Sequence, residues 1–488
     1  MPWRQAGSRT AFETAHQQAE RWRPEMTTPV APYTVMRSRA YVRLLVTAAV
    51  LGAPLAAIAF WFLKLIQVSQ GWLFSDLPEA VGFREVPLWW PLLPLPVGGL
   101  VVGLAVRYLP GHGGHSPADG INVGGGPPMP RQLVGIVLAA VASLAFGAVL
   151  GPEAPLIAIG GGLAYATVRL AGRPVPEQTG AVVAATGSNA AISTLLGSPL
   201  SGAFLLMEAS GLGGPLATLV LIPGLLAAGI GSLIFLGLGS LTGYGTFSLA
   251  IPDPPAFSQI QAVEFLWAVA IGILAAPVAW AMVWLARAVR RYAEPRPIVL
   301  TPTLGLAIAT LAIAYQAATG KPVSDVLFSG QNELPALISH SAEYTAGMLL
   351  LLLLCKGLAF VCAMAGFRGG AVFPAVFLGA AAGVLLSHLP GLPVAAGVAI
   401  GMGAMTAGVL KLPLTAVLLT TLLLGAEGVA VMPLVITASV VSYVVSVRLM
   451  PAPPVQSPTP GPTSGPQTPR VPRPQSREPR IDRPAPRA

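Results

Sequence analysis

The sequence predicts an all-α, polytopic transmembrane protein, and three observations support this fold class. Hydrophobic residues make up 54% of the 488 residues and charged residues only 10%. A soluble domain carries about 25% charged residues, so this chain has too few charges to cover a water-facing surface. Apolar stretches such as 41–67, 265–285 and 346–354 recur, and a spanning helix needs roughly 20 apolar residues. We expect about ten or more such helices, some of them too short to cross the bilayer fully.

The chain divides into three parts by composition. Residues 1–40 are polar and contain arginines but no apolar segment typical of a signal peptide, so they are predicted to be a cytoplasmic N-terminal segment. Residues 41–449 form the predicted transmembrane domain. Residues 450–488 are rich in proline and arginine and lack apolar periodicity, so they are predicted to be a disordered cytoplasmic tail.

The distribution of charge predicts the topology. Arginines gather in the N-terminal segment, in the 287–296 loop and in the tail, and basic loops stay on the cytoplasmic side of a membrane. Acidic residues dominate other loops, at 76–85, 253–264 and 325–343, which we expect to be external. The net charge of +9 therefore indicates topology and contact with lipid rather than nucleic-acid binding. A multi-pass protein of the cell (plasma) membrane with both termini cytoplasmic is predicted.

The 55 glycines and 49 prolines, many inside apolar stretches, predict discontinuous helices. Lipid offers the backbone no hydrogen-bond partners, so such breaks persist only inside protein or beside a water-filled cavity. The order of a glycine-rich break, a helix and a proline-opened helix occurs twice. It begins at 151–156 with the later helix at Pro199, and again at 369–374 with the later helix at Pro413. Two structural repeats, inverted in the membrane, are expected.

Glu153 is the one carboxylate in a long apolar stretch. A charge at mid-bilayer costs at least about 2.5–3.5 kcal/mol, so it must be paired, protonated or facing water. Pro152 and Pro155 flank it and suit the first turn of a helix. The carboxylate is therefore predicted at a helix N-terminus, a position that also favours a bound anion. If the two compete, protonation of Glu153 opens the site; the alternative is a capping carboxylate with no transport role.

The second glycine-rich break surrounds Gly369 and Gly370, which let the backbone approach a ligand closely. A helix is expected to start near 372–374 and to present N–H groups there. The alternative is a pair of glycines that serves only helix packing.

A third glycine-rich segment covers 111–120, where the side chain of His115 or Ser116 can donate a hydrogen bond to an anion. His112 and His115 hint at a metal, but no further ligands follow at suitable spacing, so no metal is predicted. A simple polar loop is the alternative.

These three segments together resemble the CLC family of chloride channels and transporters, in order and spacing as well as residues. The family's GSGIP motif is similar to Gly114-His-Ser-Pro-Ala, its G(K/R)EGP motif to Gly151-Pro-Glu-Ala-Pro, and its GxFxP motif to Gly370-Ala-Val-Phe-Pro. The resemblance covers about residues 41–449.

The resemblance implies two inverted repeats per subunit and a homodimer with one pore in each subunit. Glu153 matches the family's gating glutamate. The substrate implied is chloride or a similar small inorganic anion, bound among helix N-termini. The residues implied in anion binding are His115, Ser116, Gly151, Ala154, Gly370, Ala371, Val372 and Phe373.

The chain also departs from the family pattern. Pro152 replaces a basic residue, Ala154 a glycine and Val372 a phenylalanine, while Tyr443 falls too early to match the central tyrosine. Family exchangers often carry an internal glutamate where this chain has Ala209. We therefore expect channel-like, glutamate-gated anion conduction. The alternatives are a proton-coupled chloride antiporter and a non-conducting membrane scaffold.

The sequence contains none of the P-loop, GxSxG or HExxH motifs of common hydrolytic enzymes, so the protein is not expected to be an enzyme. No cofactor is predicted apart from the chloride ion as bound substrate. The expected partners are the anion, the lipid bilayer and a second copy of the chain.

Overall fold

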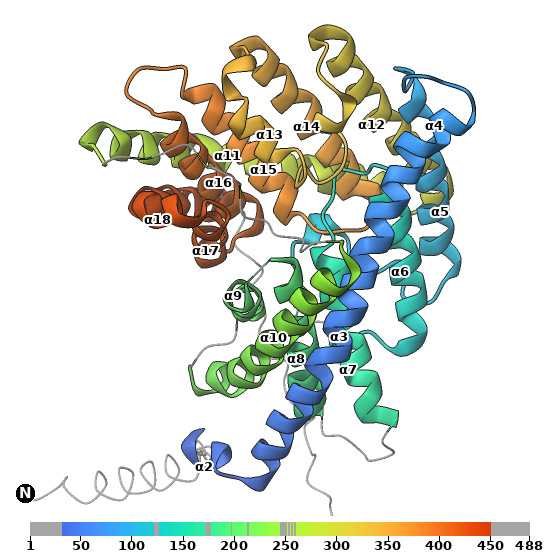
Figure 1. Cartoon of the computed structure of the whole chain (residues 1–488), viewed down its shortest axis with the longest axis vertical. Coiled ribbons are helices and arrows are strands. Elements are labelled where there is room, and N and C mark those ends of the chain that lie inside the picture. The colour runs from blue at the N-terminus through green and yellow to red at the C-terminus, as the bar shows by residue number, and fades with distance from the viewer. Residues whose placement is uncertain are drawn as a thin grey trace, which may run out of the picture. The chain divides into compact units, whose positions relative to one another are not determined.

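The computed structural model describes residues 32–121, 126–170, 177–196, 198–211, 214–244, 251, 254, 257 and 260–449 (Figure 1). Most of the predicted N-terminal segment and all of the predicted tail lie outside these ranges. All regular elements within the ranges are helices, and one isolated bridge joins Gly151 to Gly370. The predicted all-α class is confirmed.

Seven segments of the described chain are long and apolar enough to cross a membrane. They contain the helices α3 (Arg39–Gly71), α5 (Pro94–Tyr108), α10 (Gly214–Thr242), α11 (Ala262–Ala293), α12 (Pro297–Thr319), α14 (Ala346–Gly366) and α18 (Gly425–Leu449).

The other helices are shorter or less apolar, as the sequence predicted for part of the set. They are α6 (Pro130–Ala145), α7 (Glu153–Leu170), α8 (Glu177–Leu195), α9 (Pro199–Ser210), α15 (Val372–Leu386), α16 (Val394–Leu410) and α17 (Pro413–Leu423). Small connecting elements are α2 (Pro32–Met36), η1 (Trp72–Asp76), α4 (Leu77–Ala80), η2 (Trp90–Leu92), η3 (Pro117–Asp119), η4 (Val323–Asp325), α13 (Leu334–Ser339) and η5 (Ser341–Glu343).

The packing of the helices repeats between the two halves of the chain. In the first half α7 packs on α8, α8 on α10 and α10 on α3; in the second half α15 packs on α16, α16 on α18 and α18 on α11. The corresponding helices α5 and α12 are antiparallel neighbours, since Gly103 lies against Pro297 and Gly305 against Leu95. Equivalent elements thus run in opposite directions, which is the inverted repeat that the sequence predicted.

Glycines bring the central helices of each half into close contact. Gly160 of α7 and Gly187 of α8 lie so close that an added Cβ on either would collide with the other helix. Gly383 of α15 and Gly397 of α16 do the same in the second half. Small residues at helix interfaces are typical of membrane proteins, where van der Waals contact drives association.

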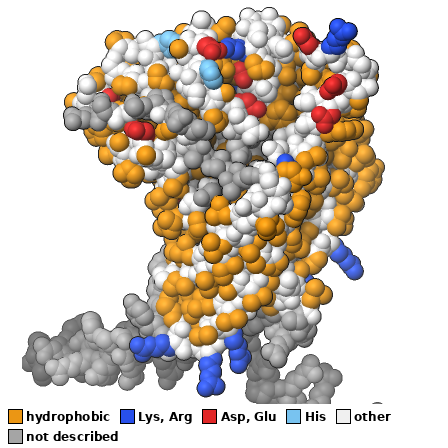
Figure 2. Space-filling view, in the orientation of Figure 1, with side chains coloured by type: hydrophobic (Ala, Val, Ile, Leu, Met, Phe, Trp, Pro, Cys, Tyr) orange, Lys and Arg blue, Asp and Glu red, His pale blue; other side chains and the backbone are white. Residues whose placement is uncertain are grey.

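The outer surface is apolar along the flank of the bundle. Figure 2 shows hydrophobic side chains over this flank, Lys and Arg side chains projecting at its lower end, and all Asp and Glu side chains visible on this face in its upper part. Large apolar side chains are half exposed along whole helices, including Val46, Trp61 and Leu65 of α3. An apolar belt between polar ends is the arrangement that a bilayer requires.

Candidate functional site

The two glycine-rich breaks meet in the interior. The N–H of Gly151 donates to the carbonyl of Gly370 at 2.8 Å, and the N–H of Gly370 donates to the carbonyl of Gly151 at 2.6 Å. Helix α7 begins at Glu153 and α15 begins at Val372, as predicted. The N-terminal ends of one helix from each repeat therefore converge at this bridge.

The Glu153 side chain is fully buried at the junction. Its Oε1 accepts a hydrogen bond from the N–H of Phe373 at 3.0 Å, so the acid of the first repeat sits at the helix start of the second. Its Oε2 has no hydrogen-bond partner among the described residues. Free N–H groups and the helix dipole favour negative charge at such a position. The carboxylate occupies a place that suits an anion.

The glycines of the junction are required by the carboxylate. A Cβ added to Gly370 or to Gly151 would collide with the carboxylate of Glu153. Gly369 is restricted by a different neighbour, because its added Cβ would lie 2.7 Å from the Cβ of Leu150. At Gly151 and Gly370 the absent side chain gives the acid room, a reason beyond helix packing.

The other residues predicted for anion binding divide between two places. Ala371, Val372 and Phe373 are buried at the junction, and Ala154 follows Glu153 in α7. His115 is exposed, whereas Ser116 is buried and donates from Oγ to the carbonyl of Met364 at 3.4 Å. In the described part of the chain no hydrogen bond links His115 or Ser116 to Glu153.

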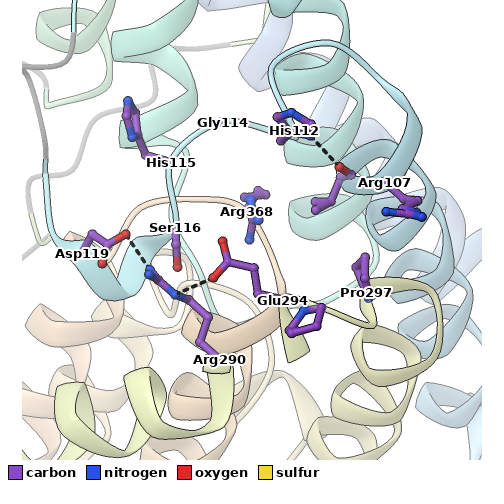
Figure 3. A pocket seen from close by; sticks show the side chains of 12 residues that line it. Arg107, His112, Gly114, His115, Ser116, Asp119, Arg290, Glu294, Pro297 and Arg368 are labelled. Carbon is purple, nitrogen blue, oxygen red and sulfur yellow. Dashed lines mark hydrogen bonds and ion pairs between the residues drawn. The ribbon is translucent and has the colours of Figure 1, made fainter. Parts of the chain in front are cut away.

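His115 and Ser116 instead line a cavity of about 380 Å³, here called the Arg368 cavity (Figure 3). Its wall also carries Arg107, Arg290 and Arg368. Of these, Arg290 is paired, with Asp119 at 2.5 Å and with Glu294 at 3.4 Å. The cavity lies where α5 and α11 end and α12 begins, so it belongs to the arginine-rich end of the bundle.

A second cavity, of about 420 Å³, lies at the opposite end and is here called the Glu333 cavity. It is lined by Gln67 and Gln70 from the end of α3 and by Phe328 and Glu333 from the loop before α13. The N–H of Phe328 donates to the carbonyl of Gly147 at 3.3 Å, close to the first break. Cavities from both ends of the bundle thus reach toward the two glycine-rich breaks.

Lys356 anchors this second loop, in a role that the sequence did not predict. Its side chain is fully buried in the middle of α14, and Nζ donates to the carbonyls of Asp325, Val326 and Leu327 at 2.9, 3.2 and 3.1 Å. Nζ also lies 4.3 Å from the centre of the Phe377 ring.

The surroundings raise the pKa of two acidic side chains in the loop. Burial raises the pKa of the Glu333 carboxyl to about 7, although the Lys356 ammonium opposes this shift. Burial also raises the pKa of Asp325, whose Oδ2 accepts hydrogen bonds from Tyr315 and Tyr344 at 3.2 Å each. Glu333 is therefore a group of this loop that can gain or lose a proton near neutral pH.

Glu208 joins the two proline-opened helices. Its carboxylate accepts hydrogen bonds from the N–H groups of Leu414 and Thr415 at 2.9 and 2.7 Å, and from the Thr415 hydroxyl at 2.6 Å. It thus caps α17 from α9. At the end of α16, Lys411 donates from Nζ to the carbonyl of Gly408 at 2.5 Å and so caps the C-terminus of that helix.

No group of three or more His, Cys, Asp and Glu side chains suited to a metal occurs in the part of the chain that the structure describes. His112 contacts the carbonyl of Val106 through Nδ1 at 3.1 Å rather than pairing with His115.

Comparison with known proteins identifies similar sequences. A family model described as "Voltage gated chloride channel" matches residues 98–447. The chain is 30% identical over 365 residues to the "Putative ion-transport protein YfeO" of Escherichia coli O17:K52:H18, covering 74% of this chain and 82% of that protein. The protein of the same name from Shigella boydii serotype 4 matches to the same extent.

Two solved structures share the fold. A slow cyanobacterial Cl⁻/H⁺ antiporter superposes with a TM-score of 0.69 at 20% identity, covering 84% of this chain and 96% of the antiporter chain. A CLC-type fluoride/proton antiporter superposes with a TM-score of 0.59 at 20% identity, covering 83% and 95% of the two chains. The names of these four proteins are those of transport proteins rather than enzymes.

Proposed function

Because this chain belongs to the CLC family of voltage-gated chloride channels, we propose that it exchanges a small inorganic anion, such as chloride, for protons across the membrane. The transport of anions is the family's activity. The exchange of protons is the finer step, and it is supported by the two solved relatives, which are named as Cl⁻/H⁺ and fluoride/proton antiporters.

One observation carries this proposal. The Glu153 carboxylate is buried against the N-terminus of α15, with one oxygen bound to the N–H of Phe373 and the other without a partner among the residues that the structure describes. An anion and the charged carboxylate compete for the same positive helix end. Protonation removes the charge of Glu153, weakens its hold on this site and lets an anion take its place. The same residue thus links anion movement to proton movement.

We favour proton-coupled exchange over the channel-like conduction that the sequence predicted. The sequence predicted a channel because Ala209 stands where family exchangers often carry an internal glutamate. Glu208, one residue earlier, is held at the start of α17 by three hydrogen bonds. We therefore do not assign it the internal proton-accepting role, and protons are proposed to reach Glu153 by another internal group.

The arginine-rich end, with the Arg368 cavity, is proposed to face the cytoplasm, as the positive-inside rule requires. Both chain termini would then be cytoplasmic, in a multi-pass protein of the cell membrane. A homodimer is also proposed. It is supported by the half-exposed Leu200 and Leu414 in the first turns of α9 and α17, two helices that contact each other and offer one apolar surface.

Flux from purified protein in liposomes tests the proposal. An imposed chloride gradient is expected to drive protons against their own gradient. Chloride flux without proton movement would support the channel instead, and the absence of both would support a scaffold that acts through its proline-rich tail. A series of chloride, bromide, nitrate and fluoride in the same vesicles identifies the preferred anion.

A further inference from the structure

Arg368 is a buried cation that forms no ion pair with an acidic side chain of the described residues. It is only 9% exposed, and no carboxylate lies within ion-pair distance of its guanidinium. Its Nε has no hydrogen-bond partner. An isolated charge is costly to bury, and a buried guanidinium is normally paired. The residue therefore needs a counter-ion.

The surroundings hold Arg368 in place. Its backbone N–H donates to Oγ of the fully buried Ser143 at 2.9 Å, and Nη1 donates to the carbonyl of Phe367 at 3.1 Å. A glycine-rich turn wraps around its aliphatic stem, since a Cβ added to Gly113 would lie 3.3 Å from Cγ of Arg368. All four residues from Gly111 to Gly114 have positive φ, a conformation that glycine tolerates. The 111–114 segment thus serves to position this arginine.

The acidic groups of the cavity are already engaged elsewhere. Asp119 and Glu294 line the Arg368 cavity, but both are paired with Arg290 (Figure 3). The cavity wall also contains Arg107, so its three arginines outnumber its two carboxylates. Such a lining attracts anions and raises their local concentration.

The position along the chain connects this cavity to the Glu153 site. Arg368 is followed directly by Gly369 and Gly370, and Gly370 contacts the Glu153 carboxylate. Two buried groups of opposite charge, each with one atom lacking a hydrogen-bond partner, therefore flank the same glycine pair: Nε of Arg368 and Oε2 of Glu153. An anion that leaves the position of one can be received by the other.

We propose that Arg368 binds a small monovalent anion in the Arg368 cavity, with guanidinium N–H groups as donors and Ser116 beside it, as the station from which the anion reaches the Glu153 site. This inference rests on the proposed function and adds a residue that sets anion affinity at the arginine-rich end. The ligand class follows from a buried guanidinium that forms no ion pair with a carboxylate of the described residues.

Chloride titration calorimetry of the purified full chain in chloride-free buffer tests the site. Wild-type protein is expected to bind chloride saturably, and Arg368→Gln is expected to weaken this binding about tenfold or more. Arg368→Lys keeps the charge and is expected to recover most of the lost affinity. Arg131→Gln, which removes an exposed arginine of α6 outside the cavity lining, is the matched control and is expected to stay within about twofold of wild type.

Chloride binding by folded Arg368→Gln within twofold of wild type would overturn the inference, as would the lack of chloride binding by wild type. If Arg368→Gln does not fold, wild-type crystals soaked in bromide provide the second readout. Anomalous density within hydrogen-bond distance of the Arg368 guanidinium is expected, and density confined to the Phe373 N–H would contradict the site. Calorimetry needs no transport, so a failure of exchange in liposomes counts against the proposed function alone.

Discussion

The N–H of Phe373 donates to the carboxylate of Glu153 at 3.0 Å. The second repeat therefore binds the side chain of the residue that begins α7 in the first repeat. This contact joins the two repeats. It depends on the bridge between Gly151 and Gly370, which fixes the two helix starts side by side. The central acid is therefore placed by both halves of the chain at once.

Gly370→Ala tests whether the Glu153 side chain needs the space that Gly370 leaves free. The new Cβ would collide with the Glu153 carboxylate, so we expect the side chain to leave the α15 N-terminus and anion flux to lose much of its pH dependence. Gly357→Ala in α14 is the control, because a Cβ there meets no atom within 4 Å. Liposome flux measured from pH 4.5 to 7.5 checks this. Wild-type pH dependence in Gly370→Ala would contradict the close approach.

Glu208→Ala tests the cap on α17. The substitution removes the acceptor for Leu414, for the Thr415 N–H and for the Thr415 hydroxyl. We expect a loss of about 1–3 kcal/mol in unfolding free energy, because hydrogen bonds to a charged group are among the stronger ones. Glu294→Ala, which breaks only an exposed ion pair with Arg290, should cost about 0–1 kcal/mol. Equal thermal midpoints for the two variants would argue against the cap.

Lys356→Met tests the anchor of the 321–333 loop. The variant leaves three buried carbonyls without their donor, and we expect a loss of about 2 kcal/mol or more. Lys321→Met is the matched control, since Lys321 pairs with the exposed Glu343 at 2.9 Å and should contribute about 1 kcal/mol or less. Proteolysis of the loop in detergent gives an independent readout. A loop no more sensitive in Lys356→Met than in Lys321→Met would contradict the anchor.

The raised pKa of Glu333 predicts that the stability of the folded protein depends on pH. Its pKa is raised from 4.5 to about 7, so folding favours the protonated form. Its contribution is fully present below the ordinary pKa of 4.5 and is lost as the pH rises through about 7. The thermal midpoint of wild type should therefore fall between pH 5 and 8, and the fall should be smaller in Glu333→Gln. Identical slopes in the two proteins would rule out this group as the cause.

Much of the fold was predictable because membrane helices leave strong local signals. The apolar stretches indicated the spans, and Pro199 and Pro413 each open the helix that they were expected to open. Helix starts at Glu153 and Val372 followed from nearby proline and glycine. These features depend on residues close in sequence, which is why the sequence alone revealed them.

Contacts across long distances in the chain were not predictable in the same way. The partners of Lys356 lie about thirty positions earlier in the chain, in a loop that folds back onto α14, and no local pattern indicates them. Ser116 and His115 were predicted to bind the anion, and the cavity that they line could not be predicted from their neighbours in the sequence. The buried state of Arg368 depends on a turn from 111–114, which no local pattern connects to position 368.

The most direct test of the central claim is coupled flux by Glu153→Gln in liposomes, since this variant removes the charge and nearly keeps the shape. We predict that wild type moves protons uphill when given a chloride gradient. We predict that Glu153→Gln still passes chloride, moves no protons and shows no change in flux with pH. Proton coupling that survives in Glu153→Gln would contradict the role given to this carboxylate.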